Sequence, residues 1–124
     1  SMADVTLALK SMFGIAPPSH YQERGHWAKS ALHRRIHDKV LGINLHRKAD
    51  VSLIDATVGM AEAHLWGPAC DPPVNRLVAG LDPVSVDVVA AGLLGRDYRR
   101  IQHLAEAPEA LGRNSGFRVV RLDC

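Results

Sequence analysis

GLDPVSVDVVAAGLLG, residues 80–95, decides how the fold of this 124-residue sequence is interpreted. A short apolar run ends in Asp82-Pro83. Aspartate is a favoured N-cap residue and proline fits the first helical position, so a helix is predicted to begin at Pro83. This helix is apolar on nearly every side, which indicates burial, and Ser85 and Asp87 interrupt its apolar surface.

Asp87 is therefore expected to be a buried carboxylate, or one that lines a cleft. A buried charge is costly unless it is paired or hydrogen-bonded. Two interpretations stay open for this residue. In the structural one, Asp87 accepts backbone hydrogen bonds or pairs with an arginine to fix a loop. In the functional one, it faces a ligand or cation beside Asp82.

The rest of the chain predicts an α/β fold: a small, mainly parallel sheet of about three strands packed with helices. Apolar runs predict strands over 51–56 and 76–80, and alternation predicts a last strand over 117–122. Helical spacing predicts a long helix over 25–47. A long loop rich in glycine and proline joins the first two strands, as in functional loops and lids. We expect residues 1–124 to form a single domain.

Four acidic side chains are predicted to converge at one edge of this sheet. Ligands of open parallel sheets bind beyond the carboxyl ends of the strands. Asp55 ends the first predicted strand, Asp82 follows the second, and Glu62 lies in the long loop. With Asp87 they would form an oxygen cluster, which suits hard cations such as Mg²⁺. The competing interpretation makes Asp82 a helix cap and Asp55 a turn residue.

Three segments of this chain resemble motifs of a known family. They are VTLALKSMFG (residues 5–14), LIDATVGM (53–60) with the following Glu62 and Gly67-Pro68, and LVAGLDPVSVDVVAAGLLG (77–95). They resemble the motifs of the family catalogued as domain of unknown function 362, over a stretch from about residue 5 to residue 107. The D-P-V-x-V-D segment is the most specific part.

The resemblance carries expectations about fold and partners. Members are distantly similar to nickel-dependent lactate racemase, an α/β protein, and often occur alongside ferredoxin-type iron–sulfur domains. Full-length members have an additional N-terminal half, so this chain is expected to correspond to the C-terminal part. The partners implied are that N-terminal half, a ferredoxin-type protein or a second copy of the chain. The family has no settled activity to transfer.

The resemblance also implies site residues. Those that correspond to motif positions are Lys10, Asp55, Glu62, Asp82 and Asp87. Ser11 stands where the motif has asparagine, and Ala56 and Ala63 stand where it has glycine. Glycine allows the backbone to approach a ligand closely, so these departures count against the family's mode of binding in this chain.

His33 and His37, on the predicted long helix, offer a weaker alternative metal site. They are four residues apart, a spacing at which two imidazoles on one helix face can share a metal. Arg34 and Arg35 lie between them, and no glutamate follows His33 as the H-E-x-x-H pattern requires. A solvated or interface flank of the helix is the favoured interpretation.

Composition narrows the function classes. The net charge of +2 and the 5% of aromatic residues do not favour nucleic-acid binding. Two cysteines without a C-x-x-C pair cannot by themselves build an iron–sulfur cluster or a cysteine-rich zinc site, and they indicate a reducing, cytoplasmic setting. No run is long enough for a membrane span, and neither a P-loop nor a nucleophile elbow is present.

We therefore expect an α/β domain that binds a small anionic or metal-bound ligand at the loop face of the sheet. Lys10 would supply positive charge, and Asp55 or Asp87 would be the general base of any reaction. The cofactor and enzymatic activity stay open. The alternative is a non-catalytic interaction or assembly domain, which pairs with the N-terminal half, an iron–sulfur partner or itself.

Overall fold

The fold combines four α-helices with a small sheet in the residues that the structure, a computed structural model, describes: 3–17, 33–62 and 67–122. The helices are α1 (Ala8–Ser11), α4 (Ile36–His46), α5 (Pro83–Leu93) and α6 (Gln102–Ala105), with 3₁₀ turns η1 (Met12–Ile15) and η2 (Tyr98–Arg100). The strands are β1 (Ser52–Ala56) and β2 (Arg76–Gly80). The mixed α/β class is thus confirmed.

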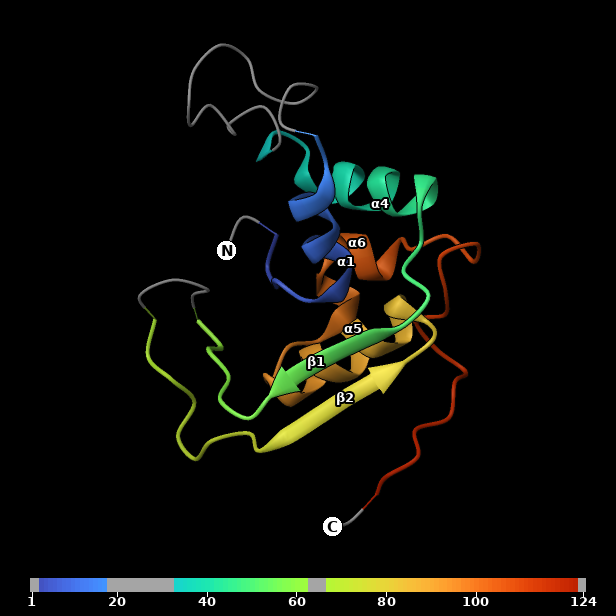
Figure 1. The fold of residues 1–124 in the computed structure, drawn as a ribbon. Coiled ribbons are helices and arrows are strands. Elements are labelled where there is room, and N and C mark those ends of the chain that lie inside the picture. The colour runs from blue at the N-terminus through green and yellow to red at the C-terminus, as the bar shows by residue number, and fades with distance from the viewer. Residues whose placement is uncertain (1–2, 18–32, 63–66, 123–124) are drawn as a thin grey trace.

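The sheet is antiparallel, so the predicted parallel arrangement is wrong. Ser52 pairs with Gly80 at one end of the sheet and Ala56 with Arg76 at the other. Parallel neighbours need a crossover connection, usually a helix, between the two strands. The described parts of the loop between β1 and β2 contain no helix, and Figure 1 shows this loop turning back at one end of the sheet.

The third predicted strand is also absent from the described residues, because 117–122 pair with neither β1 nor β2. This segment runs out from the helices toward the C-terminus as an extended trace (Figure 1). Phe117 is half-buried and the five residues after it are exposed. An alternating apolar segment becomes a strand only where it reaches a sheet edge and completes its hydrogen bonds there, and this segment reaches neither edge of the two-stranded sheet.

The helix predicted over residues 25–47 is shorter within the described residues, where α4 runs from Ile36 to His46. Arg35 has a left-handed backbone with φ of 53°, and α4 begins at the next residue. Ile36 and Val40 lie in the core, as the predicted apolar stripe requires. Residues 25–32 of the predicted helix lie outside the described residues.

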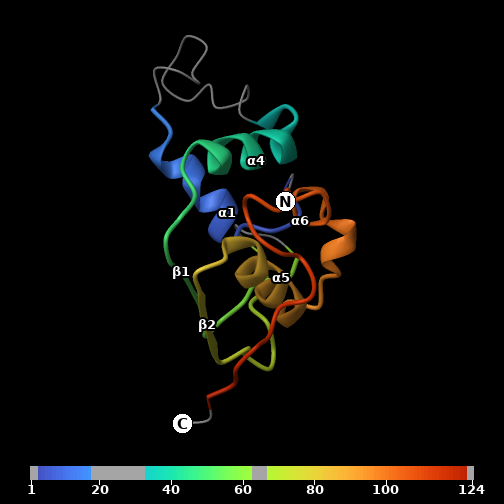
Figure 2. The same cartoon turned by 90° about the vertical axis from the view of Figure 1, so that its right-hand side faces the viewer.

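The core lies between the helices, and α5 connects it to the sheet. α5 begins at Pro83 as predicted, and it contacts both strands as well as α1 and α6. Figure 2 shows the sheet at the lower left, with α5 packed beside it and α1 and α4 beyond one end of it. Fully buried core side chains include Leu9, Val40, Val84 and Leu104. Burying each such side chain contributes about 1.5–3 kcal/mol.

Among the helices that the structure describes, none combines the length and the apolar character that crossing a membrane requires.

Candidate functional site

Asp87 is fully buried and bonds to the backbone at the start of α1. Its carboxylate accepts hydrogen bonds from the amides of Ala8 at 2.8 Å and Leu9 at 3.0 Å. α1 has no side-chain cap of its own at Leu7, so Asp87 supplies the cap from another part of the chain. Burial raises the pKa of Asp87 to about 7, against the opposing effect of the two amide hydrogen bonds. These contacts favour the structural interpretation of this residue.

Asp82 caps α5 and also holds a distant loop. One carboxylate oxygen accepts from the Ser85 amide at 3.0 Å, and the other accepts from the Arg113 amide at 2.8 Å. Burial acts to raise the pKa of Asp82, but these amides and the charge of Lys48 together lower it. Both oxygens are therefore engaged by the fold.

Gly112 makes room for the Asp82 carboxylate, a role that the sequence analysis missed. Its φ is 154°, and a Cβ added there would lie 1.9 Å from Asp82 Oδ1. An L-amino acid at this position would be strained and would displace the carboxylate. The residue lies 30 positions after Asp82, so no local pattern in the sequence connects the two.

The antiparallel sheet separates the acidic residues that were predicted to converge. Asp55 pairs with Leu77 near the start of β2, whereas Asp82 follows the other end of that strand. At about 3.3 Å per residue, the two aspartates lie roughly 15 Å apart along the sheet. The predicted convergence of Asp55 and Asp82 required parallel strands. The observed antiparallel pairing of β1 and β2 therefore contradicts it.

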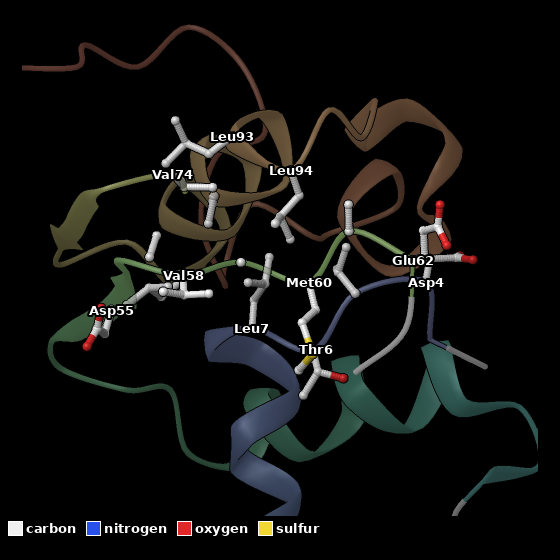
Figure 3. A pocket seen from close by; sticks show the side chains of 16 residues that line it. Asp4, Thr6, Leu7, Asp55, Val58, Met60, Glu62, Val74, Leu93 and Leu94 are labelled. Carbon is white, nitrogen blue, oxygen red and sulfur yellow. The ribbon is translucent and has the colours of Figure 1, made fainter. Parts of the chain in front are cut away.

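A cavity of about 250 Å³ lies between the loop after β1, the segment before α1 and the end of α5. Its walls are mainly apolar, and the side chains that form them include Leu7, Ile54, Val58, Met60, Val74 and Leu94. Figure 3 places Asp4 and Glu62 together at one end and Asp55 at the other. Of the predicted site residues, only Asp55 and Glu62 line this cavity; Lys10, Asp82 and Asp87 do not.

The two ends of the cavity differ in their acidic groups. Asp55 points away from the cavity in Figure 3 and accepts hydrogen bonds from the hydroxyl and amide of Thr57, which lower its pKa. At the opposite end, Asp4 Oδ2 lies 3.8 Å from His37 Nε2. No lysine or arginine is among the described residues of the lining. The Asp4 and Glu62 end therefore favours cations.

Arg96 holds the loop that carries Glu62. Its guanidinium donates to the carbonyl oxygen of Ala61, with Nε at 3.2 Å, and Ala61 lines the cavity next to Glu62. This contact ties the loop to the segment after α5. Residues 63–66 of the same loop, including the Ala63 departure from the motif, lie outside the described residues.

Lys10 is not one of the residues that line the cavity. Its ammonium donates to the Thr6 hydroxyl at 3.0 Å, and partial burial lowers the pKa of Lys10. Thr6 itself lines the cavity. Lys10 therefore reaches the cavity wall through Thr6.

The partner of His37 is His103 of α6, which was not predicted. Their Nδ1 atoms are 2.8 Å apart and the rings stack, with centroids separated by 5.1 Å. Burial, and next the nearby His37, lower the pKa of His103 to about 4, and the tautomers of the two rings decide which nitrogen donates. His33 and His37 do not share one helix, because the backbone reverses its handedness at Arg35.

Among residues 3–17, 33–62 and 67–122, no group of three or more histidine, cysteine, aspartate or glutamate side chains is placed to hold a metal ion. The Asp4 and Glu62 end of the cavity has two such groups. Any cation bound there would need further ligands from another molecule or from water.

Comparison with known protein families gives a match over residues 1–92, to the family described as Domain of unknown function (DUF362). The chain belongs to this family. The DUF362 match includes both strands, the loop between them and most of α5, and it ends before η2 and α6. Neither a curated protein nor a solved structure matches the chain. The resemblance noted from the sequence motifs is thus confirmed.

Proposed function

We propose that this DUF362 protein binds a small organic acid in the form of its complex with a divalent cation. The observation that carries the proposal is the asymmetry of the cavity: an apolar middle with Asp4 and Glu62 at one end. A free anion would be repelled by these carboxylates, because no described lining residue has a positive charge. A cation between the ligand and the protein removes that repulsion.

The number of protein carboxylates favours a metal complex over a bare ion. Hard cations such as Mg²⁺ and Ca²⁺ take about six or more oxygen ligands. Asp4 and Glu62 fill only part of such a shell, so a chelating ligand and water would complete it. The apolar side chains beyond them would then contact the carbon skeleton of the ligand.

The geometry supports binding rather than base catalysis. Asp55 points out of the cavity, and its hydrogen bonds to Thr57 lower its pKa, which makes it a weak base. Asp87 does not line the cavity, and its carboxylate is taken up by the amides of α1. Neither of the aspartates first considered as a base is placed to act on a ligand there.

Thermal denaturation with Mg²⁺ or Mn²⁺, each combined with a panel of small dicarboxylates and hydroxy acids, tests the proposal. We expect the melting temperature to rise with cation and acid together, and less with either alone. At a ligand concentration of 100 times Kd, binding stabilises the protein by about 2.7 kcal/mol. Glu62→Gln and Asp4→Asn should abolish the shift. Asparagine tolerates the left-handed backbone of Asp4, whose φ is 60°.

Asp55→Asn is the matched control, because it removes a carboxylate from the lining that points away from the cavity. It should leave the shift intact. Two results would overturn the proposal: no shift with any cation and acid pair, or an undiminished shift in both Glu62→Gln and Asp4→Asn.

A further inference from the structure

The outer face of the sheet is apolar and uncovered by the described residues. Leu53, Leu77 and Leu81 are 68%, 70% and 74% exposed, and Val51 is 64% exposed. The register places Leu53 opposite Ala79 and Asp55 opposite Leu77, so these side chains share the face that α5 does not cover. In Figure 2, α5 lies on the other side of the sheet, α1 and α4 lie beyond one end of it, and no helix covers this face. A contiguous apolar surface of this kind is typical of an interaction site.

The tail segment 117–122 is the second uncovered apolar feature. Val120 and Leu122 are 64% and 85% exposed, and Arg118 is exposed as well. These three residues alternate along the chain, so in an extended segment they share one side. No residue of the described ranges forms an ion pair with Arg118 or Arg121.

The two features match in spacing and in charge. Val51, just before β1, and Leu53 and Asp55 within it are every second residue over about 13 Å. Along the tail, Arg118, Val120 and Leu122 have the same spacing. If the tail runs antiparallel to β1, Arg118 faces Asp55, and two apolar pairs follow.

We infer that the tail segment of one copy of this chain packs on the outer face of the sheet of a second copy, and the reverse, to form a symmetric dimer. Asp55 is exposed and its described contacts are to Thr57, so its charge is open to a guanidinium. The tail of the same chain continues past the lower end of the sheet and does not cover this face (Figures 1 and 2). In such a dimer each tail covers the sheet face of the other copy, so the apolar side chains of both tails and both sheet faces are buried. Burial of this apolar surface provides the driving force for association.

Sedimentation equilibrium over a wide concentration range tests the inference. The wild type should be a dimer in equilibrium with monomer. Leu53→Asp on the sheet and Leu122→Asp on the tail should each raise the dimer dissociation constant roughly tenfold or more. Leu45→Asp is the control, because Leu45 is 54% exposed on α4, away from the sheet. It should leave the dissociation constant unchanged.

A charge exchange distinguishes pairing between chains from docking of the tail on its own sheet. Asp55→Arg puts arginine opposite arginine, and Arg118→Asp puts aspartate opposite aspartate, so each variant alone should be mainly monomeric. Mixed together, the two variants restore an arginine–aspartate pair at both contacts of a heterodimer. The mixture should therefore dimerise nearly as well as the wild type.

Three results would overturn the inference. The first is a wild type that stays monomeric at every concentration. The second is a dimer that Leu53→Asp weakens and Leu122→Asp does not, since the sheet faces would then pair with each other. The third is a mixture of the two charge variants that dimerises no better than either variant alone.

Discussion

Asp87, inside α5, is fully buried and accepts two backbone hydrogen bonds from α1, whereas Asp55, on β1, is exposed and bonds to Thr57 two residues away. Asp82 resembles Asp87, because each of its oxygens accepts from a backbone amide. Asn44 in the same helical region is buried and donates to the carbonyls of Leu9 and Val40, each at 2.8 Å. Asp82, Asp87 and Asn44 thus connect segments that are distant in the sequence, whereas Asp55 is exposed and bonds within its own turn.

The comparison shows that a motif residue can serve the fold rather than a ligand. Within the DUF362 match, Asp82 and Asp87 hold backbone segments far apart in the sequence. Glu62 lines a cavity and has no such task among its described contacts. Variants at these positions should therefore separate losses of stability from losses of binding.

The largest effect is expected for Asp87→Ala. The variant leaves the buried Leu9 amide and the partly buried Ala8 amide without this acceptor, and each unsatisfied buried group costs about 1–3 kcal/mol. We expect the free energy of unfolding to fall by about 3 kcal/mol, measured by urea denaturation followed by circular dichroism. A loss below about 1 kcal/mol would mean that α1 does not depend on this cap.

Gly112→Ala should have the second-largest effect, about 2 kcal/mol. The new Cβ would meet the Asp82 carboxylate, which must then move away from Ser85 and Arg113. Asp82→Ala alone should cost about 1 kcal/mol, the usual value for an N-cap. In the Asp82→Ala background, Gly112→Ala should cost less, and strict additivity of the two losses would contradict this contact.

The pH dependence of stability should change in Asp87→Asn. The pKa of Asp87 is raised from 3.8 to about 7 in the folded protein, so its stabilising contribution is lost as the pH rises through this window. The pKa of His103 is lowered from 6.5 to about 4, so its effect is the opposite: stability rises with pH between these values. Asp87→Asn removes the first contribution, and its stability should rise more steeply between pH 4 and 6.5 than that of the wild type.

Denaturation in urea at several pH values measures this slope. His103→Gln in the wild-type background is the matched variant, and it should make stability fall more steeply as the pH rises. Slopes that are unchanged in both variants would show that neither group titrates between its ordinary pKa and the shifted one.

The smallest effect is expected for Asp55→Ala. The carboxylate is exposed and bonds within its own turn, so the free energy of unfolding of the monomer should change by less than about 0.5 kcal/mol. Denaturation at a concentration where the chain is monomeric measures this. A loss as large as that of Asp87→Ala would remove the distinction between the two regions.

Much of the local structure was predictable from the sequence. The cap and first-turn proline at Asp82-Pro83 predicted the start of α5, and the nearly continuous apolar surface predicted the burial of Asp87. The two apolar runs at 51–56 and 76–80 are β1 and β2, to within one residue. These predictions depend on interactions within a few residues, and the local pattern contains them.

The direction of pairing and the third strand were not predictable in this way. Residues 117–122 alternate like a strand but meet no sheet edge in the described chain. Asp87, the acceptor for the α1 amides, lies 79 residues after Ala8 and 78 after Leu9 in the chain. Asp4 lines the cavity because of the course that the backbone takes before α1. Such contacts leave no periodic trace in one sequence.

By itself, the sequence determined the α/β class, the beginning of α5 and membership of the DUF362 family, because caps, apolar periodicity and motifs are local properties of the chain. Only the tertiary structure decided which acidic residues are used by the fold and which line the cavity. Antiparallel pairing places Asp55 and Asp82 at opposite ends of the sheet, and the packing of α1 on α5 brings two amides to Asp87. Those outcomes depend on how distant segments pack together, which the sequence of each segment does not specify.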